Sequence, residues 1–176
     1  RTGRFTSPHV ERMSERISID GEPLVDEAFV RAFNDVAPYT HVVDAAGPHP
    51  LSFFETIVGM AYAAFADAPV DVAVVEVGMG GSWDATNVID ADVAVVTPVA
   101  VDHASYLGTT PAAIAVEKAG IIKPGATAVL AEQTVDVAEV LLRRASEVGA
   151  TVLREGIEFG VLHRVPAVGG QSVSLR

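Results

Sequence analysis

Apolar residues recur along the chain with two different spacings, and each spacing predicts a different kind of element. Residues 51–66 carry apolar side chains at the helical interval, namely Phe54, Ile57, Val58, Ala61 and Phe65. Residues 71–77 and 92–96 are near-continuous apolar runs, a pattern typical of strands covered on both faces, as in parallel sheets. The pattern therefore predicts one amphipathic helix and two buried strands.

Shorter signals complete the expected order of elements. We expect loops over 1–15 and 44–50, helices over 26–36, 111–119 and 134–148, and strands over 16–20, 126–131 and 151–153. Two further runs, 159–165 and 171–175, are joined by glycines and predict a terminal β-hairpin. Because strands alternate with helices, the expected fold class is α/β, with a largely parallel sheet and helices on both faces.

Composition narrows the classes of partner. The 176 residues carry a formal net charge of −11, which argues against nucleic acid and against an anionic membrane surface. The chain has no cysteine, so disulfides and thiol chemistry are excluded, and this fits a reducing cytoplasm. No apolar run has the roughly 18 residues of a membrane-spanning helix. The chain starts on Arg1 without Met and stops inside the alternating run Ser172-Val173-Ser174-Leu175, so we expect a fragment of a larger protein.

Three candidate residues follow three consecutive predicted elements. Glu76 ends the first apolar run and precedes Gly78, Gly80 and Gly81. Ligands of open α/β sheets bind just outside the carboxyl ends of strands, so a carboxylate there is a candidate site residue. The alternative is a capping or ion-pairing carboxylate, with glycines that merely shape a turn. The same glycines also let backbone approach a ligand and present amides to an anion.

His103 follows the second apolar run, next to Asp102, and Lys118 lies in a helix of otherwise small or apolar residues beside Glu117. Imidazole and carboxylate together suit a divalent cation, and magnesium typically serves phosphate chemistry. A structural histidine and a surface lysine paired with Glu117 or Glu55 are the alternatives. We expect Glu76, His103 and Lys118 to converge at the rim of the sheet.

Other candidate positions have equally good structural explanations. Ser52 and Glu55 stand three apart, which matches a capping box. Asp84 and Asn87 fit an Asx turn, and Ser7 lies before Pro8 in a sequence that is ordinary for a loop.

Together these stretches resemble the folylpolyglutamate synthase/dihydrofolate synthase family of the Mur-ligase-like amide ligases. Six motifs occur in the family's order and spacing. The first combines Thr6-Ser7-Pro8-His9 with Glu15-Arg16-Ile17, and the second is Ser52-Phe53-Phe54-Glu55. The others are Glu76-Val77-Gly78-Met79-Gly80-Gly81, Asp84-Ala85-Thr86-Asn87, Asp102-His103 with Leu107-Gly108, and Glu117-Lys118-Ala119-Gly120-Ile121-Ile122-Lys123.

The resemblance implies roles for individual residues. Glu76, His103 and Ser7 match magnesium ligands, and Lys118 matches a lysine that the family carbamylates. The stretches 52–55 and 83–85 match contacts with the pterin end of folate, namely Ser52, Phe53, Phe54, Glu55, Trp83, Asp84 and Ala85. Two departures, Ser52 for a usual threonine and Ser82-Trp83 for a usual Arg-Leu pair, affect the expected substrate preference rather than the reaction.

The implied activity is that of a ligase in folate biosynthesis and one-carbon metabolism. It uses ATP and two magnesium ions to add L-glutamate to dihydropteroate, tetrahydrofolate or both, through an acyl phosphate. We expect residues 1–176 to be part of the central Mg-ATP-binding domain of a cytoplasmic monomer. The phosphate-binding loop is then expected upstream, and the glutamate-binding domain downstream.

Three alternatives remain at this stage. Another Mur-type ligase acting on a UDP-muramyl substrate shares the Glu, His and Lys, although Ser7-Pro8 and Phe53-Phe54-Glu55 favour folate. A Rossmann-type dinucleotide-binding domain would use the glycines, but the spaced Gly-x-Gly-x-x-Gly fingerprint is missing. A non-catalytic binding module is the third.

Overall fold

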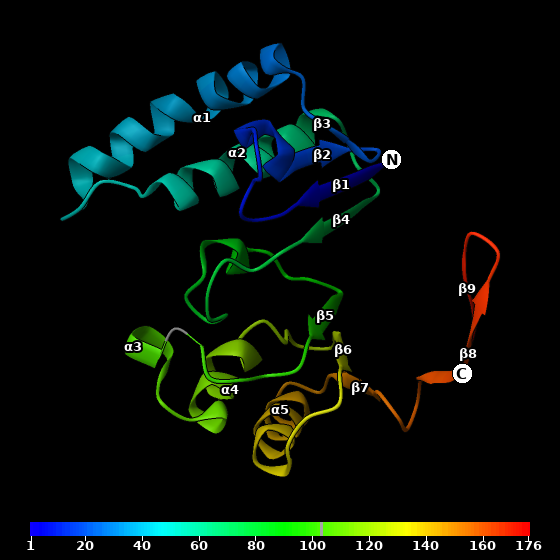
Figure 1. The fold of residues 1–176 in the computed structure, drawn as a ribbon. Coiled ribbons are helices and arrows are strands. Elements are labelled where there is room, and N and C mark those ends of the chain that lie inside the picture. The colour runs from blue at the N-terminus through cyan, green and yellow to red at the C-terminus, as the bar shows by residue number, and fades with distance from the viewer. Residues whose placement is uncertain (103) are drawn as a thin grey trace. The chain divides into compact units, whose positions relative to one another are not determined.

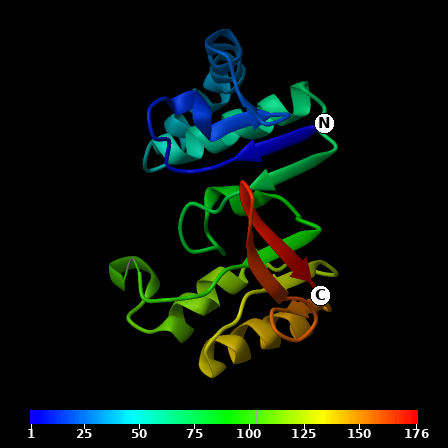
Figure 2. The same ribbon diagram turned by 45° about the vertical axis from the view of Figure 1, so that its right-hand side comes forward.

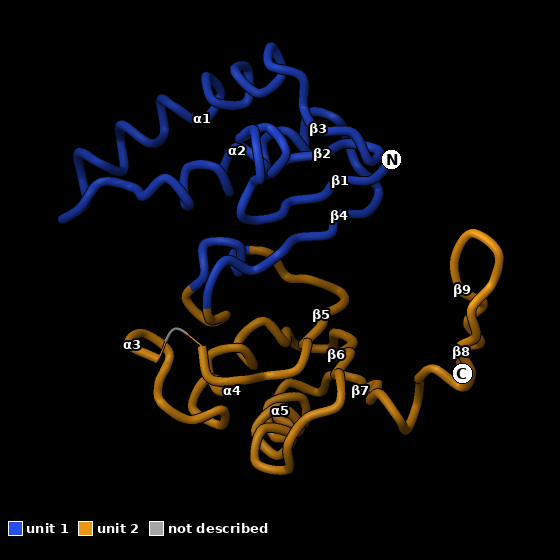
Figure 3. Tube along the Cα trace, in the orientation of Figure 1, with its two compact units in different colours: residues 1–79, 84–88 blue, residues 80–83, 89–176 orange. Residues whose placement is uncertain are grey.

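The computed structural model describes residues 1–102 and 104–176, so His103 lies outside the described residues. The chain divides into two compact units. Unit 1 comprises residues 1–79 and 84–88, and unit 2 comprises residues 80–83 and 89–176 (Figure 3).

Unit 1 is built on a four-stranded mixed sheet in the order β3-β2-β1-β4 (Figure 1). Its strands are β1 (Thr2–Phe5), β2 (Ile17–Ile19), β3 (Glu22–Pro23) and β4 (Val72–Val75). A short 3-10 helix, η1 (Met13–Arg16), leads into β2. The pair β1–β4 is parallel, running from Thr2 opposite Val72 to Phe5 opposite Val75, whereas the other two pairs are antiparallel.

Two helices complete unit 1, α1 (Asp26–Ala46) and α2 (Phe53–Asp67), with a second 3-10 helix, η2 (Ala85–Val88). The core forms between the sheet and the two helices, from Phe5, Ile17, Ala32, Ile57, Val58, Met60, Ala61 and Phe65. The helical spacing of residues 51–66 thus buries the face that the sequence predicts.

Unit 2 contains a three-stranded parallel sheet in the order β5-β6-β7. Its strands are β5 (Val93–Val96), β6 (Thr127–Leu130) and β7 (Thr151–Arg154), and its helices are α3 (Ala104–Leu107), α4 (Pro111–Ala119) and α5 (Val135–Glu147). Thr110 caps α4, where its hydroxyl accepts the amide of Ala113 at 3.2 Å. Buried apolar residues, among them Ile114, Ile122 and Leu141, form the core.

A two-stranded antiparallel hairpin, β8 (Val161–Ala167) and β9 (Gly170–Leu175), ends the chain (Figures 1 and 2). The sequence-based prediction of a hairpin is confirmed. All residues of both strands are exposed, so the hairpin adds nothing to the core of unit 2.

Two predicted boundaries were wrong. Residues 2–5 form β1 rather than part of a loop. The sequence pattern missed this strand because only two of its positions face inward, Gly3 and Phe5, and Gly3, whose backbone lies against the ring of Phe65, gives no apolar signal. Helix α1 continues past residue 36 through Pro38 to Ala46, so residues 44–46 are helical rather than loop. Gly47 ends the helix, and its amide donates to the carbonyl of Val43 at 2.8 Å.

The apolar strands are not covered on both faces within their own units. In β4, Val72 and Val74 are 58% and 64% exposed, and in β5, Val93 and Val95 are 54% and 59% exposed. The alternate residues Ala94 and Val96 of β5 are buried. The apolar run of β5 therefore has one buried face, whereas in β4 Ala73 is exposed as well and only Val75 is partly buried, so the prediction of double coverage is not met inside either unit. Among the described residues, no helix has both the length and the apolar character to cross a membrane.

Candidate functional site

Glu76 leaves the carboxyl end of β4 beside residues that leave the parallel strand β1. Its amide donates to the carbonyl of Phe5 at 3.0 Å, which continues the parallel ladder by one residue. The Thr6 hydroxyl donates a short hydrogen bond to Oε2 of Glu76, and the Ser7 amide donates to the same oxygen at 2.9 Å. Among the described residues Oε1 accepts no hydrogen bond, so the carboxylate is fixed through one oxygen and offers the other.

The segment 6–12, here called the Ser7 loop, is held in place at its far end by Glu15. The Glu15 carboxylate accepts the amides of Val10, Glu11 and Arg12 at 2.9, 3.1 and 2.7 Å. These backbone hydrogen bonds, led by that of Val10, hold the pKa of Glu15 below its usual value. The Ser7 loop is therefore fixed to Glu76 at one end and to Glu15 at the other.

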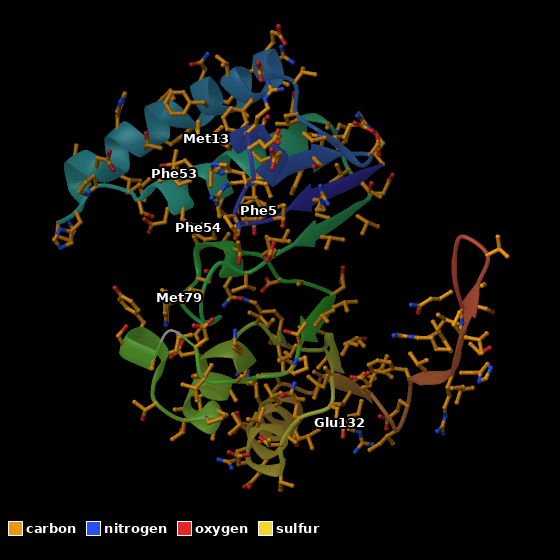
Figure 4. All side chains as sticks on the ribbon, viewed as in Figure 1. Phe5, Met13, Phe53, Phe54, Met79 and Glu132 are labelled. Carbon is orange, nitrogen blue, oxygen red and sulfur yellow. The ribbon has the colours of Figure 1, made fainter. Side chains whose placement is uncertain are left out.

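Phe53 and Phe54 lie next to each other in the sequence but differ in environment (Figure 4). The Phe54 ring packs edge-to-face on Phe5, with centroids 5.9 Å apart, and lies over the backbone of Gly78, where a Cβ would come within 2.3 Å of Cζ. Phe53 is 53% exposed, and the guanidinium carbon of Arg16 lies 5.2 Å from its ring centroid. Phe54 thus supports the turn after Glu76, whereas Phe53 presents an aromatic face.

Ser52 and Glu55 use their polar groups on each other. The Glu55 carboxylate accepts the amide and the hydroxyl of Ser52, both at 2.7 Å, and the Ser52 hydroxyl accepts the Glu55 amide at 3.2 Å. These bonds, the Ser52 hydroxyl first, lower the pKa of Glu55. The predicted capping box is confirmed, while substrate contact by these two residues stays a prediction.

Asp84 is buried and has both carboxylate oxygens engaged. Oδ2 accepts the Met79 amide at 2.8 Å, and Oδ1 accepts the Thr86 amide and hydroxyl at 2.9 and 2.5 Å. The Thr86 amide bond confirms the Asx turn. Tyr62 donates its hydroxyl to the carbonyl of Thr86 at 2.7 Å, and burial, with a smaller contribution from the Asp84 charge, raises the pKa of Tyr62 to about 12. A polar network therefore sets the turn that connects Met79 to Thr86.

Lys118 lies in the last turn of α4 in unit 2 and is partly buried. Among the described residues of unit 2 it forms no ion pair, so the alternative of a surface lysine paired with Glu117 is not met there. The indole of Trp83, in the same unit, is 53% exposed. Ala85 belongs to unit 1, at the start of η2, and is partly buried.

The structure brings together part of the predicted site. Ser7 and Glu76 are adjacent in unit 1, whereas Lys118 belongs to unit 2 and His103 lies outside the described residues. The convergence of Glu76, His103 and Lys118 therefore stays a prediction. Within residues 1–102 and 104–176, no group of three His, Cys, Asp or Glu side chains is arranged to hold a metal ion.

Two further residues of the site had no role assigned from the sequence. Thr6 orients Glu76, and its position directly after β1 was the available signal. Arg16 is buried, donates from Nε to Nδ1 of His9 at 2.9 Å and supports Phe53. Its place directly before the alternating run 17–19 was the available signal for it.

Known proteins resemble the chain over its whole length, although no family model matches it. A dihydrofolate synthase/folylpolyglutamate synthase of Mycobacterium tuberculosis is 50% identical over 189 residues, which cover 100% of this chain and 39% of that protein. The chain belongs to the folylpolyglutamate synthase/dihydrofolate synthase family. A family member of Escherichia coli is 36% identical over 159 residues, covering 90% of this chain and 36% of the relative.

Solved structures of the family agree with the fold. Folylpolyglutamate synthase of Mycobacterium tuberculosis, complexed with ADP and AMPPCP, gives a TM-score of 0.93 at 51% identity, covering 99% of this chain and 41% of that one. A folylpolyglutamate synthase complex with AMPPCP and folate gives 0.92 at 40% identity, covering 99% and 43%. The predicted family and the α/β class with parallel strands are confirmed, and the chain spans about two fifths of the length of these relatives.

Proposed function

We propose that the chain is part of the Mg-ATP-binding domain of a ligase that adds L-glutamate to dihydropteroate, tetrahydrofolate or both. The observation that carries the proposal is the Glu76 carboxylate, fixed by Thr6 and Ser7 at the carboxyl end of parallel strands with one oxygen available. The 50% identity to a dihydrofolate synthase/folylpolyglutamate synthase, and the nucleotide and folate in the complexes of similar proteins, support the substrate classes.

The residues of unit 1 fit magnesium by their chemistry. A carboxylate oxygen of Glu76 and the hydroxyl of Ser7 are hard oxygen donors, which Mg²⁺ prefers. The two residues are neighbours, because the Ser7 amide donates a hydrogen bond to the Glu76 carboxylate. His103 is the proposed fellow ligand of Glu76 on one magnesium ion, and Ser7 is the proposed ligand of the other. Bound magnesium would offset negative charge on the phosphate oxygens of ATP. The chain itself orients Glu76, because Thr6 and the Ser7 amide hold Oε2. The position of the other carboxylate oxygen is thereby fixed.

The proposed reaction has two steps. A folate carboxylate oxygen attacks the γ-phosphorus of ATP, the bond from that phosphorus to the bridging oxygen breaks, and ADP leaves. The amine of glutamate then attacks the acyl carbon, phosphate leaves with the bonding electrons, and the nitrogen releases a proton. The exposed ring of Phe53 is the surface in unit 1 best suited to stack against a flat pterin.

The Glu76 assignment is tested by Glu76→Gln in the ligase that contains this chain. The amide keeps the size of the side chain but removes its charge, so we expect turnover to fall on the order of 10²-fold or more. Glu22→Gln, at an exposed position of β3, is the matched control and should leave turnover unchanged. Circular dichroism checks the fold. Near-normal ligation by a folded Glu76→Gln enzyme would refute the assignment.

Lys118 is the proposed site of carbamylation. The Lys118 ammonium first loses a proton. The lone pair of the neutral Nζ then attacks the carbon of CO2, an N–C bond forms, one C=O electron pair moves onto oxygen and the nitrogen releases a second proton, so a cation becomes an anion suited to bind metal. Lys118→Ala is expected to abolish ligation, and short carboxylic acids should restore part of it. An inactive variant that no carboxylic acid rescues, with an unmodified lysine in the parent enzyme by mass spectrometry, would count against carbamylation.

The substrate is tested by direct comparison. Ligation of glutamate to dihydropteroate and to tetrahydrofolate is measured beside amino-acid addition to a UDP-muramyl substrate. We expect turnover with one or both pteridines and none with the muramyl nucleotide. The reverse result would assign the ligase to the Mur-type enzymes that act on muramyl nucleotides. It would not contradict the proposed magnesium ligands.

We also propose that the ligase is a cytoplasmic monomer without nucleic-acid or membrane partners. The net charge of −11 and the absence of cysteine support this proposal. Light scattering after size exclusion should give the mass of one chain. A dimer mass would contradict it.

A further inference from the structure

The segment Gly80–Trp83, here called the glycine loop, lies with its backbone against the last turn of α4. The Ser82 amide donates to the carbonyl of Glu117 at 2.9 Å, and the Ser82 hydroxyl reaches the same carbonyl at 3.1 Å. Both groups belong to unit 2. The Ser82 amide is thus satisfied inside the protein, so the sequence-based idea of a glycine turn that presents amides to an anion does not apply to this residue.

Two glycines face each other across this contact. A Cβ at Gly81 would lie 2.4 Å from the carbonyl oxygen of Glu117 and 3.0 Å from Cα of Lys118. A Cβ at Gly120 would lie 2.3 Å from the hydroxyl oxygen of Ser82 and 2.6 Å from its Cα. Most of these neighbours are backbone atoms, so a rotamer change cannot relieve the overlap, and one of the two backbones has to move.

Lys118 sits between these two glycines in the contact. Its Cα and its carbonyl oxygen are both near the position of the missing Cβ at Gly81, the oxygen at 3.1 Å. A displaced loop would therefore push directly on the turn that carries Lys118. A misplacement of about 1 Å, even one produced by a change remote from the chemistry, can lower a rate about 10²-fold.

We propose that Gly81 and Gly120 are positioning residues. They hold the backbone of Lys118 in the position that its side chain needs for carbamylation and for binding metal. This inference rests on the proposed function of Lys118. It assigns Gly81 and Gly120 to close packing between the glycine loop and the last turn of α4, so the effect of a side chain at either glycine reaches the reaction only through Lys118.

The test compares glycine variants in the full ligase. Gly81→Ala is expected to lower kcat about 10-fold to 100-fold, with a smaller change in the KM for glutamate. The carbamate of Lys118 gives a carbon-13 NMR signal after incubation with labelled CO2, and this signal should fall in parallel. A purely stabilising role for the glycine would not change that signal in a folded protein.

Gly125→Ala is the matched control. Gly125 has φ +72° with nothing within 4 Å of its missing Cβ, so alanine there strains the backbone of unit 2 without touching α4 or the glycine loop. We expect a lower melting temperature with unchanged kcat and carbamate signal. If Gly81→Ala does not fold, Ser82→Ala removes the 3.1 Å bond from the hydroxyl to the carbonyl of Glu117, and it should lower kcat and carbamate signal several-fold.

The outcomes separate the two proposals. Turnover by Lys118→Ala, measured in parallel, would overturn the proposed role of Lys118. An inactive Lys118→Ala together with a folded Gly81→Ala that keeps normal kcat and a full carbamate signal would overturn the positioning inference alone. Loss of both signal and turnover in Gly125→Ala would also overturn it, because any strain in unit 2 would then suffice.

Discussion

Tyr62 shows how a single side chain connects the helix α2 to the turn after Glu76. Its hydroxyl donates to the carbonyl of Thr86, whose own amide and hydroxyl bind the Asp84 carboxylate. The phenol is therefore held neutral by burial and by a nearby negative charge. An ionised Tyr62 would lose its donor and repel Asp84.

The raised pKa of Tyr62 predicts a loss of stability at high pH. In the unfolded chain the phenol ionises near its usual pKa of 10, whereas in the folded protein its pKa is about 12. Its contribution is complete below pH 10 and disappears as pH rises through 12. Tyr62→Phe should remove this dependence, and should cost about 0.5–1.5 kcal/mol at neutral pH through the lost hydrogen bond.

Urea unfolding between pH 7 and 12 measures both effects. Tyr39→Phe is the control, because the Tyr39 side chain is 73% exposed and its removal should leave the pH profile unchanged. Identical profiles for Tyr62→Phe and the parent chain would contradict the assignment.

Some site residues were predictable because their roles depend on local spacing. Ser52 and Glu55 lie within one helical turn, and Asp84 and Thr86 within one Asx turn, so the sequence contains both partners. Thr6 was missed as a partner of Glu76 because the two residues are 70 apart. Their contact exists only because β1 and β4 pair in parallel, and Gly3 hides β1 from any apolar pattern.

At the scale of elements, boundaries followed the capping signals where these were strong. Helix α2 begins after Ser52, α4 after Thr110, and both hydroxyls accept an amide of the first turn. Helix α1 begins at Asp26 as predicted although it has no side-chain cap, but it continues through Pro38 and ends only before Gly47. Proline alone did not end the helix.

The capping box predicts that substitutions at two N-cap residues, Ser52 and Thr134, lower the free energy of unfolding by different amounts. Ser52→Ala removes the acceptor for the Glu55 amide and should lower the free energy of unfolding by about 1 kcal/mol. Thr134→Ala, at the N-cap of α5, should cost less than about 0.5 kcal/mol because its side chain accepts no helix amide. Chemical denaturation followed by circular dichroism compares the two, and equal costs would argue against the capping box.

At the scale of the whole molecule, the sequence predicted the class of fold better than the arrangement of its strands into sheets. Alternating strands and helices implied one parallel sheet, whereas the structure has a mixed sheet in unit 1 and a parallel sheet in unit 2. The exposed valines of β4 and β5 explain part of the difference. An apolar strand pattern therefore does not by itself say how many of its faces are covered or which sheet the strand joins.

Two separate cores predict additive losses of stability. Ile57 and Leu141 are fully buried in units 1 and 2 respectively, and replacing either by alanine should cost about 2–5 kcal/mol. Because the two side chains share no core, the double variant should equal the sum within about 0.5 kcal/mol. Urea titrations of all four proteins measure this, and strong coupling between the substitutions would show that the cores do not respond separately.

The glycine loop also contains the chain's only tryptophan, Trp83. Its indole is about half exposed and lies against Gly80, where a Cβ would approach the ring within 3.2 Å. Tryptophan fluorescence therefore comes from within the glycine loop, whose backbone packs against α4. The emission maximum would report the environment of this loop in solution without any added dye. A shift of the maximum on addition of nucleotide or folate would show that ligand binding changes the surroundings of Trp83, close to Lys118.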